Sequence, residues 1–458
     1  MNFDETIAAI STPIGTGGVC MVRVCGKEAV NLADQIFLGH SKPSQHISHS
    51  LHNGYIIDPL TKEKIDHVLI GVMLGKKTYT GLDTIEIYGH GGVLNAKRIL
   101  DVCIKYGARH AEPGEFTKIA FLNGKMDLSQ VEAVADLIHA KTESARRSSM
   151  AQFMGNLSHE IDELKKQLIK LCSLLELDLD FGEENLINIT KESIDAQITN
   201  VRLQIEKLLS TYNTGHLIRE GAKISIIGKP NVGKSSLLNA MLKRNRAIVS
   251  DIPGTTRDFI EESLDIEGIP FIFVDTAGIR QSKDVVENQG IQSSMEIAKN
   301  SDLILVIFDG SEDLNEEDIN ILKMVEDLIW KQKHVKALFI ANKCDKENYN
   351  PQRTKNDFIE ISAKNDIGID KLKRSIGDLF LNNFSIESPM ITRLRHKDAL
   401  ENSVVSLNNA KVSLHNKMSY EFISLDIKNA IRHLGEIIGE VTGDDVLNNI
   451  FSNFCIGK

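Results

Sequence analysis

Cysteine is scarce in this sequence, and the few cysteines are scattered. The six cysteines among 458 residues form no C-x-x-C pair and no Cys/His cluster, which excludes a disulfide framework and gives no sign of a zinc site. The first residues, MNFDETIAAISTPIG, are acidic where a signal peptide is basic, and no apolar run approaches the ~18 residues that span a bilayer. We therefore expect a cytoplasmic protein without a membrane anchor.

Positive charge is also in deficit. Lys and Arg number 53 against 63 Asp and Glu, giving a net charge of −10. Broad nucleic-acid binding depends on many basic side chains meeting phosphates, so an RNA substrate would need a local patch or a partner protein. Lys141, Arg146 and Arg147 form one such possible patch, although charges of this kind usually only solvate a helix face.

Hydrophobic periodicity divides the chain into four segments. Residues 1–123 alternate short β-type runs such as VCMVRV and DTIEIYG with turns, and residues 220–382 alternate apolar strands with helical stretches, the pattern of a mostly parallel sheet. Residues 124–219 and 383–458 have the three-and-four spacing of amphipathic helices, and a long helix beginning at an Asp127/Gln130 capping box is expected from MDLSQ to LDLDF. We predict a multidomain fold: an N-terminal α/β domain, an all-α helical domain, and a nucleotide-binding α/β domain inserted in the helical one.

The segment GKPNVGKSS matches the phosphate-binding pattern G-x-x-x-x-G-K-[ST]. It stands between the strand KISIIG and the helix SSLLNAMLK, which is the context that the motif requires. Gly228 and Gly233 allow the loop to wrap its N–H groups around phosphate oxygens, Lys234 neutralises the β/γ charge, and Ser235 offers a hydroxyl to Mg²⁺. These features predict a P-loop.

Three further motifs follow apolar strands in the order found in GTPases: DTAG at 275–278, NKCD at 342–345 and SAK at 362–364. The Asp345 carboxylate can accept the N1–H and 2-amino protons of guanine, whereas adenine would leave buried groups unpaired at about 1–3 kcal/mol each. GTP is thus favoured over ATP. Thr256, in DIPGTTRD, is the natural second Mg²⁺ hydroxyl, but Ile279 stands where Ras-like proteins carry a water-orienting glutamine, so hydrolysis needs another group.

Several motifs together resemble the MnmE (TrmE) family of tRNA-modification GTPases over essentially the whole chain. They are TPIGTGGVCMVRVCG, GLDTIEIYGHGG, AEPGEFTKIAFLNGKMDLSQVEA, GKPNVGKSSLLNA, DIPGTTRD, DTAGIR and the terminal FCIGK. The resemblance implies a Ras-like G domain, a homodimer through the N-terminal domain, and an FAD-containing partner of the MnmG/GidA family in a heterotetramer or larger complex. The implied reaction adds an aminomethyl or carboxymethylaminomethyl group at C5 of uridine 34 of certain tRNAs.

The same resemblance implies that K⁺ takes the place of an arginine finger when two G domains face each other. Its ligands would be Asn231, Ser250, Ile252 and Thr255, Mg²⁺ would be held by Ser235 and Thr256, and the catalytic residues would be Glu287, which positions water, and Lys234. An ordinary solvated carboxylate is the alternative for Glu287. The nucleotide-binding candidates are Asn231, Val232, Gly233, Lys234, Ser235, Ser236, Ser250, Asp251, Ile252, Pro253, Gly254, Thr255, Thr256, Asp275, Thr276, Ala277, Gly278, Asn342, Lys343, Asp345, Ser362, Ala363 and Lys364.

The family's N-terminal domain is similar to folate-binding aminomethyltransferases and binds a 5-formyl- or 5,10-methylene-tetrahydrofolate. The matching positions are Arg23, Glu86, Lys125 and Lys458. A pterin ring offers N–H donors to a carboxylate, and the glutamate tail of folate favours Arg or Lys, so the residue types suit the ligand. Taken singly and without the resemblance, Arg23 and Lys125 are more typical of ordinary surface charges.

The terminal FSNFCIGK places a cysteine four residues from the end, as in a prenylation signal. Lys458 is not a residue that prenyltransferases accept in last position, and no polybasic run lies upstream. By the resemblance, the tail folds back to the folate site, where Cys455 is either a reactive thiol or a buried, inert one.

Two other readings stay open from the residues. One is a ribosome-assembly GTPase, against which the C-terminal segment shows no GXXG loop in a KH-type setting, and the other is a GTP-regulated folate enzyme acting on a small molecule. A His-rich tract, His40, His46, His49 and His52, reads as a connector, with a metal site as its alternative.

Overall fold

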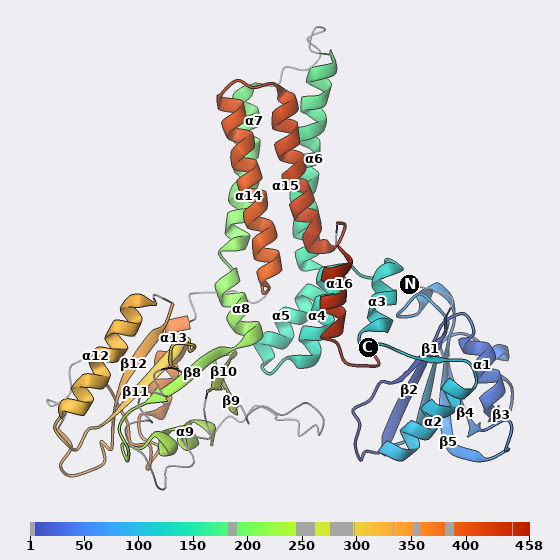
Figure 1. The fold of residues 1–458 in the computed structure, drawn as a ribbon, viewed down its shortest axis with the longest axis horizontal. Coiled ribbons are helices and arrows are strands. Elements are labelled where there is room, and N and C mark those ends of the chain that lie inside the picture. The colour runs from blue at the N-terminus through green and yellow to red at the C-terminus, as the bar shows by residue number, and fades with distance from the viewer. Residues whose placement is uncertain are drawn as a thin grey trace.

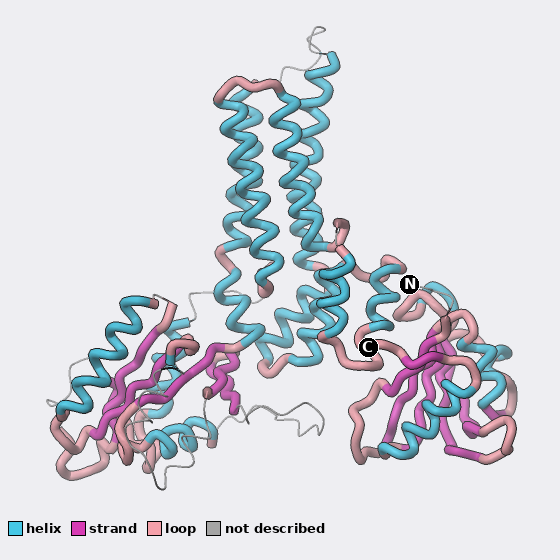
Figure 2. The backbone as a smooth tube through the Cα atoms, viewed as in Figure 1, coloured by secondary structure: helices cyan, strands magenta, loops and turns pink. Residues whose placement is uncertain are grey.

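A four-helix bundle stands between two α/β units (Figures 1 and 2). The computed structural model describes residues 5–181, 190–243, 262–274, 296, 298–332, 334–350, 358–380, 389–441 and 443–458. In Figure 1 the α/β units flank the base of the bundle, and the C-terminus returns to the N-terminal unit.

The N-terminal unit is built on a seven-stranded sheet of order β3-β4-β5-β6-β2-β1-β7. Its pairs are antiparallel except β1 with β7, and α2 (Val93–Lys105) packs against several of its strands around one apolar core. The strands are β1 (Ile7–Ile10), β2 (Val19–Cys25), β3 (Phe37–Gly39), β4 (Ser50–Ile57), β5 (Lys64–Met73), β6 (Thr84–His90) and β7 (Arg109–His110). Its other helical elements are α1 (Ala29–Ile36), α3 (Glu115–Leu122) and the 3₁₀ turns η1 (Pro43–Gln45) and η2 (Gly75–Lys77).

The His-rich tract is only partly a connector. His52 lies in β4, and the His46 ring stacks on it with centroids 3.2 Å apart. Among the residues that the structure describes, no group of three or more His, Cys, Asp or Glu side chains is arranged to hold a metal ion.

The bundle combines helices from both sides of the nucleotide-binding segment. They are α6 (Asn156–Phe181), α7 (Lys191–Leu209), α14 (Leu394–His415) and α15 (Tyr420–Ile438). Leucines and isoleucines of all four share one core, so the predicted packing of the helical runs is confirmed. The described helices do not include one long and apolar enough to cross a membrane. At the base lie α4 (Leu128–His139), α5 (Glu143–Phe153), α8 (Tyr212–Glu220) and α16 (Asp444–Ser452).

The prediction of one long helix after residue 125 was wrong, because the chain forms α4, α5 and α6 in succession. The Asp127/Gln130 capping box does open α4. However, the Thr142 hydroxyl accepts a hydrogen bond from Ala145 N and begins a new helix, and Gly155, at φ +89°, separates α5 from α6. Apolar spacing alone did not reveal these two breaks.

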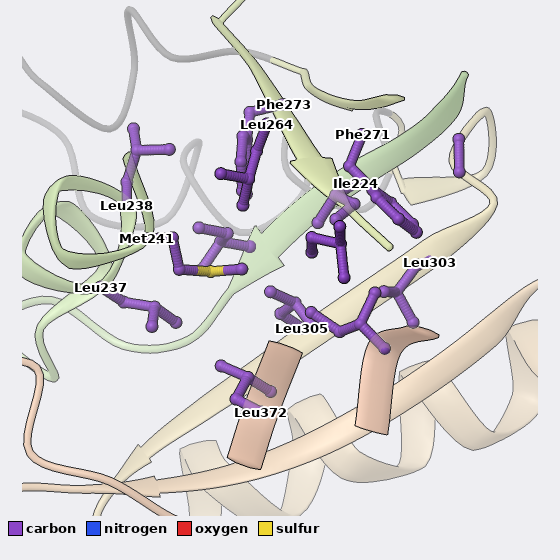
Figure 3. Packing of buried hydrophobic residues seen from close by; sticks show 14 of the residues in the cluster. Ile224, Leu237, Leu238, Met241, Leu264, Phe271, Phe273, Leu303, Leu305 and Leu372 are labelled. Atoms are coloured by element: carbon purple, nitrogen blue, oxygen red, sulfur yellow. The ribbon is translucent and has the colours of Figure 1, made fainter. Parts of the chain in front are cut away.

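The second α/β unit has a six-stranded sheet of order β13-β12-β11-β8-β10-β9, parallel except at edge strand β9. Alternate residues of β11 enter two cores. Leu303 and Leu305 face the side covered by α9 and α13 (Figure 3), and Ile304 and Val306 share the other core with residues of α12. The predicted, mostly parallel sheet is confirmed. Its elements are β8 (Ala222–Ile227), α9 (Lys234–Leu242), β9 (Glu262–Ile266), β10 (Ile269–Phe273), β11 (Leu303–Asp309), α12 (Glu316–Lys331), β12 (Lys336–Asn342), β13 (Phe358–Glu360) and α13 (Ile369–Phe380).

Candidate nucleotide and tail sites

The predicted P-loop connects the end of β8 to the start of α9. Gly233 caps α9 in the left-handed region, at φ +106°, and a Cβ there would lie 2.2 Å from the Asn342 amide nitrogen. Asn231 also has a positive φ, of 63°. Only glycine fits the conformation and the close approach at position 233, so the local sequence shapes a loop that leads directly into a helix N-terminus.

Lys234 is the first residue of α9, and its side chain turns back over the loop. Its Nζ donates hydrogen bonds to the carbonyl oxygens of Gly228 and Lys229, at 2.7 and 2.8 Å. Burial lowers the pKa of this ammonium group from its ordinary value. Ser235 and Ser236 follow in the first turn, as the motif requires.

Asn342 joins the P-loop to the SAK loop. Its side-chain nitrogen donates to Val232 O at 2.7 Å, and its side-chain oxygen accepts from Ala363 N at 3.0 Å. The side chain is buried, and the neighbouring Lys343 forms an ion pair with Asp309 at the end of β11. Three segments distant in sequence are thus held together by one amide, a role that the strand-end motifs alone did not reveal.

Asp345 lies exposed beside the SAK loop. The Ser362 hydroxyl hydrogen-bonds to this carboxylate and, as the largest cause, holds its pKa below the ordinary value, so it is ionised at neutral pH. Asn365 Nδ2 also donates to it, at 3.0 Å. An ionised acceptor at this position matches the donors of a guanine edge, and Lys364 lies one residue away from Asn365.

The other predicted nucleotide-site residues lie outside the described residues. They are Ser250, Asp251, Ile252, Pro253, Gly254, Thr255, Thr256, Asp275, Thr276, Ala277, Gly278 and Glu287.

Arg23 and Glu86 face each other across neighbouring strands of the N-terminal sheet. They are register partners on β2 and β6, Arg23 Nε lies 3.0 Å from Glu86 Oε1, and both side chains are 13% exposed. The Tyr88 hydroxyl donates to the second Glu86 oxygen, and burial, followed by that carboxylate, raises the pKa of Tyr88 to about 12. The guanidinium also lies 5.5 Å from the Phe116 ring centroid.

The C-terminal tail lies against this pair. Gly457 O accepts hydrogen bonds from Ser11 Oγ at 2.9 Å and from Arg23 Nη1 at 3.3 Å, and Phe116 N donates to Lys458 O. Burial, then Arg23, lowers the pKa of the Lys458 ammonium group. The structure therefore brings Arg23, Glu86 and Lys458 together, and it shows Cys455 exposed, which contradicts the buried alternative.

Lys125 lies near the loop that carries Tyr79. Its Nζ donates to Lys76 O, and its side chain passes beside Gly81. The Tyr79 ring lies 6.0 Å from both Arg23 Cζ and Lys458 Nζ, and its hydroxyl lies 3.0 Å from Thr117 Oγ1. Sequence reasoning missed Tyr79 and Tyr88. Tyr88 shares a strand face with Glu86 at a spacing of two, a signal that could have found it.

One carboxylate partly neutralises the candidate RNA patch. Arg146 and Arg147 both pair with Glu143 on the same helix, at 2.7 and 3.0 Å. Their hydrogen bonds, led by that of Arg146, lower the pKa of Glu143 to about 2. This leaves Lys141 as the member of the patch outside that pairing.

A loop capped by a left-handed glycine, a parallel sheet and strand-end guanine motifs define a P-loop domain of the GTPase class. Comparison with known proteins extends this to the whole chain. The model of the MnmE helical domain matches residues 128–455, and that of the GTP-binding protein TrmE N-terminus matches residues 6–125.

Full-length relatives agree. The tRNA modification GTPase MnmE of Alkaliphilus oremlandii is 42% identical over all of this chain and all of its own, and that of Carboxydothermus hydrogenoformans is 40% identical over 99% of this chain and all of its own. The solved structure of Aquifex aeolicus Era bound to GDP.AlF4- is 27% identical over 40% of this chain and 66% of its own, with a TM-score of 0.26. The chain belongs to the MnmE family of tRNA modification GTPases.

Proposed function

We propose that this protein hydrolyses GTP to GDP and phosphate in the modification of tRNA. With an FAD-containing partner of the MnmG/GidA family, it adds an aminomethyl or carboxymethylaminomethyl group at C5 of uridine 34, and a tetrahydrofolate derivative donates the carbon. The observation that carries the proposal is the tail: Gly457 and Lys458 lie on the Arg23–Glu86 pair beside Tyr79 and Phe116. Such a set of groups suits a folate, because the carboxylate can accept hydrogen bonds from the N–H groups of the pterin and the cations can bind the glutamate tail.

In the nucleotide site, this chain's residues would bind guanine, orient the attacking water and neutralise the phosphates. Lys234 neutralises the β/γ-phosphates, Asp345 selects guanine, and Glu287 orients the attacking water in place of the glutamine absent at Ile279. Ser235, in the first turn of α9 beside Lys234, suits Mg²⁺ together with Thr256.

The K⁺ proposal rests on oxygen ligands from Asn231, Ser250, Ile252 and Thr255. Asn231 lies in the P-loop, and its exposed amide oxygen is chemically suited to K⁺. When two G domains face each other, the cation would supply the charge stabilisation that an arginine finger gives in other GTPases. We therefore expect hydrolysis to be faster in K⁺ than in Na⁺, and Asn231→Ala to remove this difference.

In the folate site, Glu86 would accept hydrogen bonds from pterin N–H groups, and Arg23, Lys125 and Lys458 would face the carbonyl and carboxylate oxygens of a 5-formyl- or 5,10-methylene-tetrahydrofolate. The protein would act in the cytoplasm as a homodimer joined through the N-terminal domain, within a heterotetramer or larger complex that also binds tRNA. The net charge of −10 favours a partner that supplies much of the tRNA grip.

Calorimetric titration of the full chain with 5-formyltetrahydrofolate tests the proposal. We expect binding that weakens on removal of Lys458 and is unchanged in Lys170→Ala, a control that removes one exposed ammonium from α6. No binding to the full chain, with GDP still bound, would overturn the one-carbon function. Nucleoside mass analysis of tRNA from depleted cells then separates tRNA from a small-molecule substrate, because unmodified uridine 34 must accumulate only in the first case.

A further inference from the structure

One carboxylate oxygen at the base of the bundle accepts hydrogen bonds from two arginines, one that precedes the nucleotide-binding unit in the sequence and one that follows it. Asp136 Oδ1, on α4, accepts from Arg219 Nε at 2.8 Å and from Arg393 Nη2 at 2.7 Å. The three side chains are largely buried, with exposed fractions of 10%, 26% and 19%. Hydrogen bonds between ionised groups at such distances are strong and directional.

Arg219 and Arg393 mark the entrance to and the exit from the nucleotide-binding unit. Arg219 is near the end of α8, which leads through Gly221 directly into β8 and the P-loop, and Arg393 caps α14, the first helix after that unit. The two segments also touch each other, because Ile391 N donates to the buried Thr211 hydroxyl at 3.0 Å. Movement of the unit relative to the bundle must therefore act on this junction.

Another face of α4 packs on the helix that carries the tail. Figure 1 shows α16 beside α4, and Val131 and Val134 share an apolar core with Leu447 and Phe451 of α16 and with Phe454. The chain runs from Phe454 directly into the tail at Arg23 and Glu86. A single three-turn helix thus contacts both connections of the nucleotide-binding unit and the support of the tail.

The packing at this junction is incomplete. A pocket of about 340 Å³, partly open to solvent, lies beside it, and its lining includes Asp136, Arg219 and Arg393 together with Asn449 of α16 and Asn453 just after that helix. Close-packed interiors transmit strain and leave side chains little room to move, whereas open space beside a cluster allows its side chains to change partners. The junction can therefore shift without distorting the bundle core.

We propose that Asp136 is a positioning residue that couples the nucleotide state of the P-loop unit to the placement of the C-terminal tail. Through Arg219 and Arg393 it fixes α4 to both connecting segments, and through α16 the position of α4 sets how the tail lies on Arg23 and Glu86. The inference rests on the proposed function in that the tail belongs to a folate site. It adds the residue through which the two sites communicate.

The test compares the full chain in two states, with GDP and Mg²⁺ and with GDP, AlF₄⁻, Mg²⁺ and K⁺. Two readouts report on the tail: the affinity for 5-formyltetrahydrofolate, and the rate of Cys455 alkylation by iodoacetamide followed by peptide mass mapping. In the unaltered chain we expect each to differ between the states by about fivefold or more. Asp136→Asn, which keeps the shape and loses the charge, should bring both ratios close to one and leave GTP turnover unchanged.

The matched control is Glu143→Gln, which removes an acidic partner of two arginines within the single helix α5 and should keep the ratios. Arg219→Gln and Arg393→Gln each break one connection, and each should lower the ratios even if Asp136→Asn folds poorly by circular dichroism. The inference would be overturned if the unaltered chain had the same folate affinity and the same Cys455 alkylation rate in both nucleotide states. It would also be overturned if Asp136→Asn, Arg219→Gln and Arg393→Gln all kept the differences that the unaltered chain shows. Alkylation that follows the nucleotide state without any folate binding would support the coupling and reject the one-carbon function.

Discussion

In the described part of the nucleotide site, the Asn342 side chain links the P-loop to the SAK loop. In Asn342→Ala the Val232 carbonyl and the Ala363 N–H, both in buried surroundings, lose their partner. Unpaired buried polar groups cost about 1–3 kcal/mol each, so we expect a lower unfolding midpoint and GDP affinity reduced by at least tenfold. Denaturant unfolding and calorimetry measure the two effects.

The control for this prediction is Asn239→Ala, which removes an exposed amide from the neighbouring helix α9. It should leave the midpoint and the GDP affinity unchanged. Normal GDP binding by Asn342→Ala would show that the two loops hold their positions without the amide bridge.

Gly457 provides a separate test of the tail. Its φ is +96°, and an added Cβ would lie 2.4 Å from Ile10 O, so Gly457→Ala must displace the tail from Ser11 and Arg23. We expect loss of 5-formyltetrahydrofolate binding with an unfolding midpoint close to that of the unaltered chain, because the apolar cores beside the tail include Phe451 and Phe454 but none of residues 455–458. In Gly443→Ala, where φ is −71° and nothing lies within 4 Å, binding should persist, and equal binding by both variants would refute this role of the tail.

Motifs and residue types predicted part of these sites before the fold was known. The P-loop motif predicted the turn that leads into α9 at Lys234, and the guanine motif predicted a strand that ends at Asn342, because such motifs specify local backbone geometry. The contact of Tyr79 with Arg23 was not predictable, since Tyr79 lies in a loop whose course depends on contacts distant in sequence.

Helix α8 and the segment before α14 form an element pair that a single methyl group can separate. A Cβ on Gly215 would lie 2.2 Å from Ile391 O, a backbone atom that cannot rotate away. Overpacking of this kind costs about 1–3 kcal/mol, so Gly215→Ala should lower the unfolding midpoint. A melting curve followed by circular dichroism measures the loss.

Gly435→Ala is the matched helix glycine in α15. Its added methyl meets only the flexible Glu440 carboxylate, at 2.9 Å, and alanine is the better helix former by up to about 1 kcal/mol. We expect an unchanged or higher midpoint for this variant. A midpoint for Gly215→Ala as high as that of Gly435→Ala would mean that the entry helix and the exit segment do not pack as described.

Element types were more predictable than element ends. The apolar runs of the nucleotide-binding unit predicted five of its six strands, since strands buried on both faces are continuously hydrophobic, and missed the edge strand β9, whose sequence ESLDI is not a continuous apolar run. The single helix expected after residue 125 became three, because a threonine cap and a left-handed glycine act on the backbone without interrupting the apolar spacing.

At the scale of the whole molecule, no local pattern brings residue 458 to residue 23. Ser11 and Gly457 are bonded across 446 positions, and only the family resemblance implied that the tail returns to the N-terminal unit. Local patterns also do not assemble the bundle, since two of its helices precede the P-loop segment in the sequence, two follow it, and all four share one core. Such long-range pairings are set by the total burial of apolar faces, which single-segment periodicity does not encode.

The buried charges around Glu132 make the stability of the whole molecule depend on pH. Glu132 is 2% exposed and bonds to Arg395 at 3.0 Å, with the fully buried His396 at 2.8 Å and Arg393 at 3.7 Å. Although desolvation alone would raise it, these neighbours hold the pKa of Glu132 well below its ordinary value, and burial lowers the pKa of His396.

Both lowered pKa values act in the same direction. A histidine that is neutral when folded loses its contribution as pH falls below about 6.5, where the unfolded chain takes up the proton, and a carboxylate with a lowered pKa loses its contribution below about 4.3. We therefore expect the free energy of unfolding, from denaturant titrations, to be highest near neutral pH and to decrease from pH 7 to pH 3.

Glu132→Gln separates the carboxylate from the rest of this pH dependence. It leaves the partly buried Arg395 without its carboxylate partner, whereas Arg393 keeps Asp136, and the loss of one member of a buried ion pair costs up to about 3–5 kcal/mol at pH 7. Below about pH 4.3 the unfolded form of the unaltered chain takes up a proton on Glu132 while the folded form keeps the carboxylate ionised, so the stabilising contribution of Glu132, and with it the difference between the two proteins, should shrink as pH falls. The control is Glu143→Gln, in which the lost carboxylate is exposed, so little change in the free energy of unfolding is expected at any pH. If the difference in the free energy of unfolding between Glu132→Gln and the unaltered chain stayed constant down to pH 3, Glu132 would not be the group that titrates.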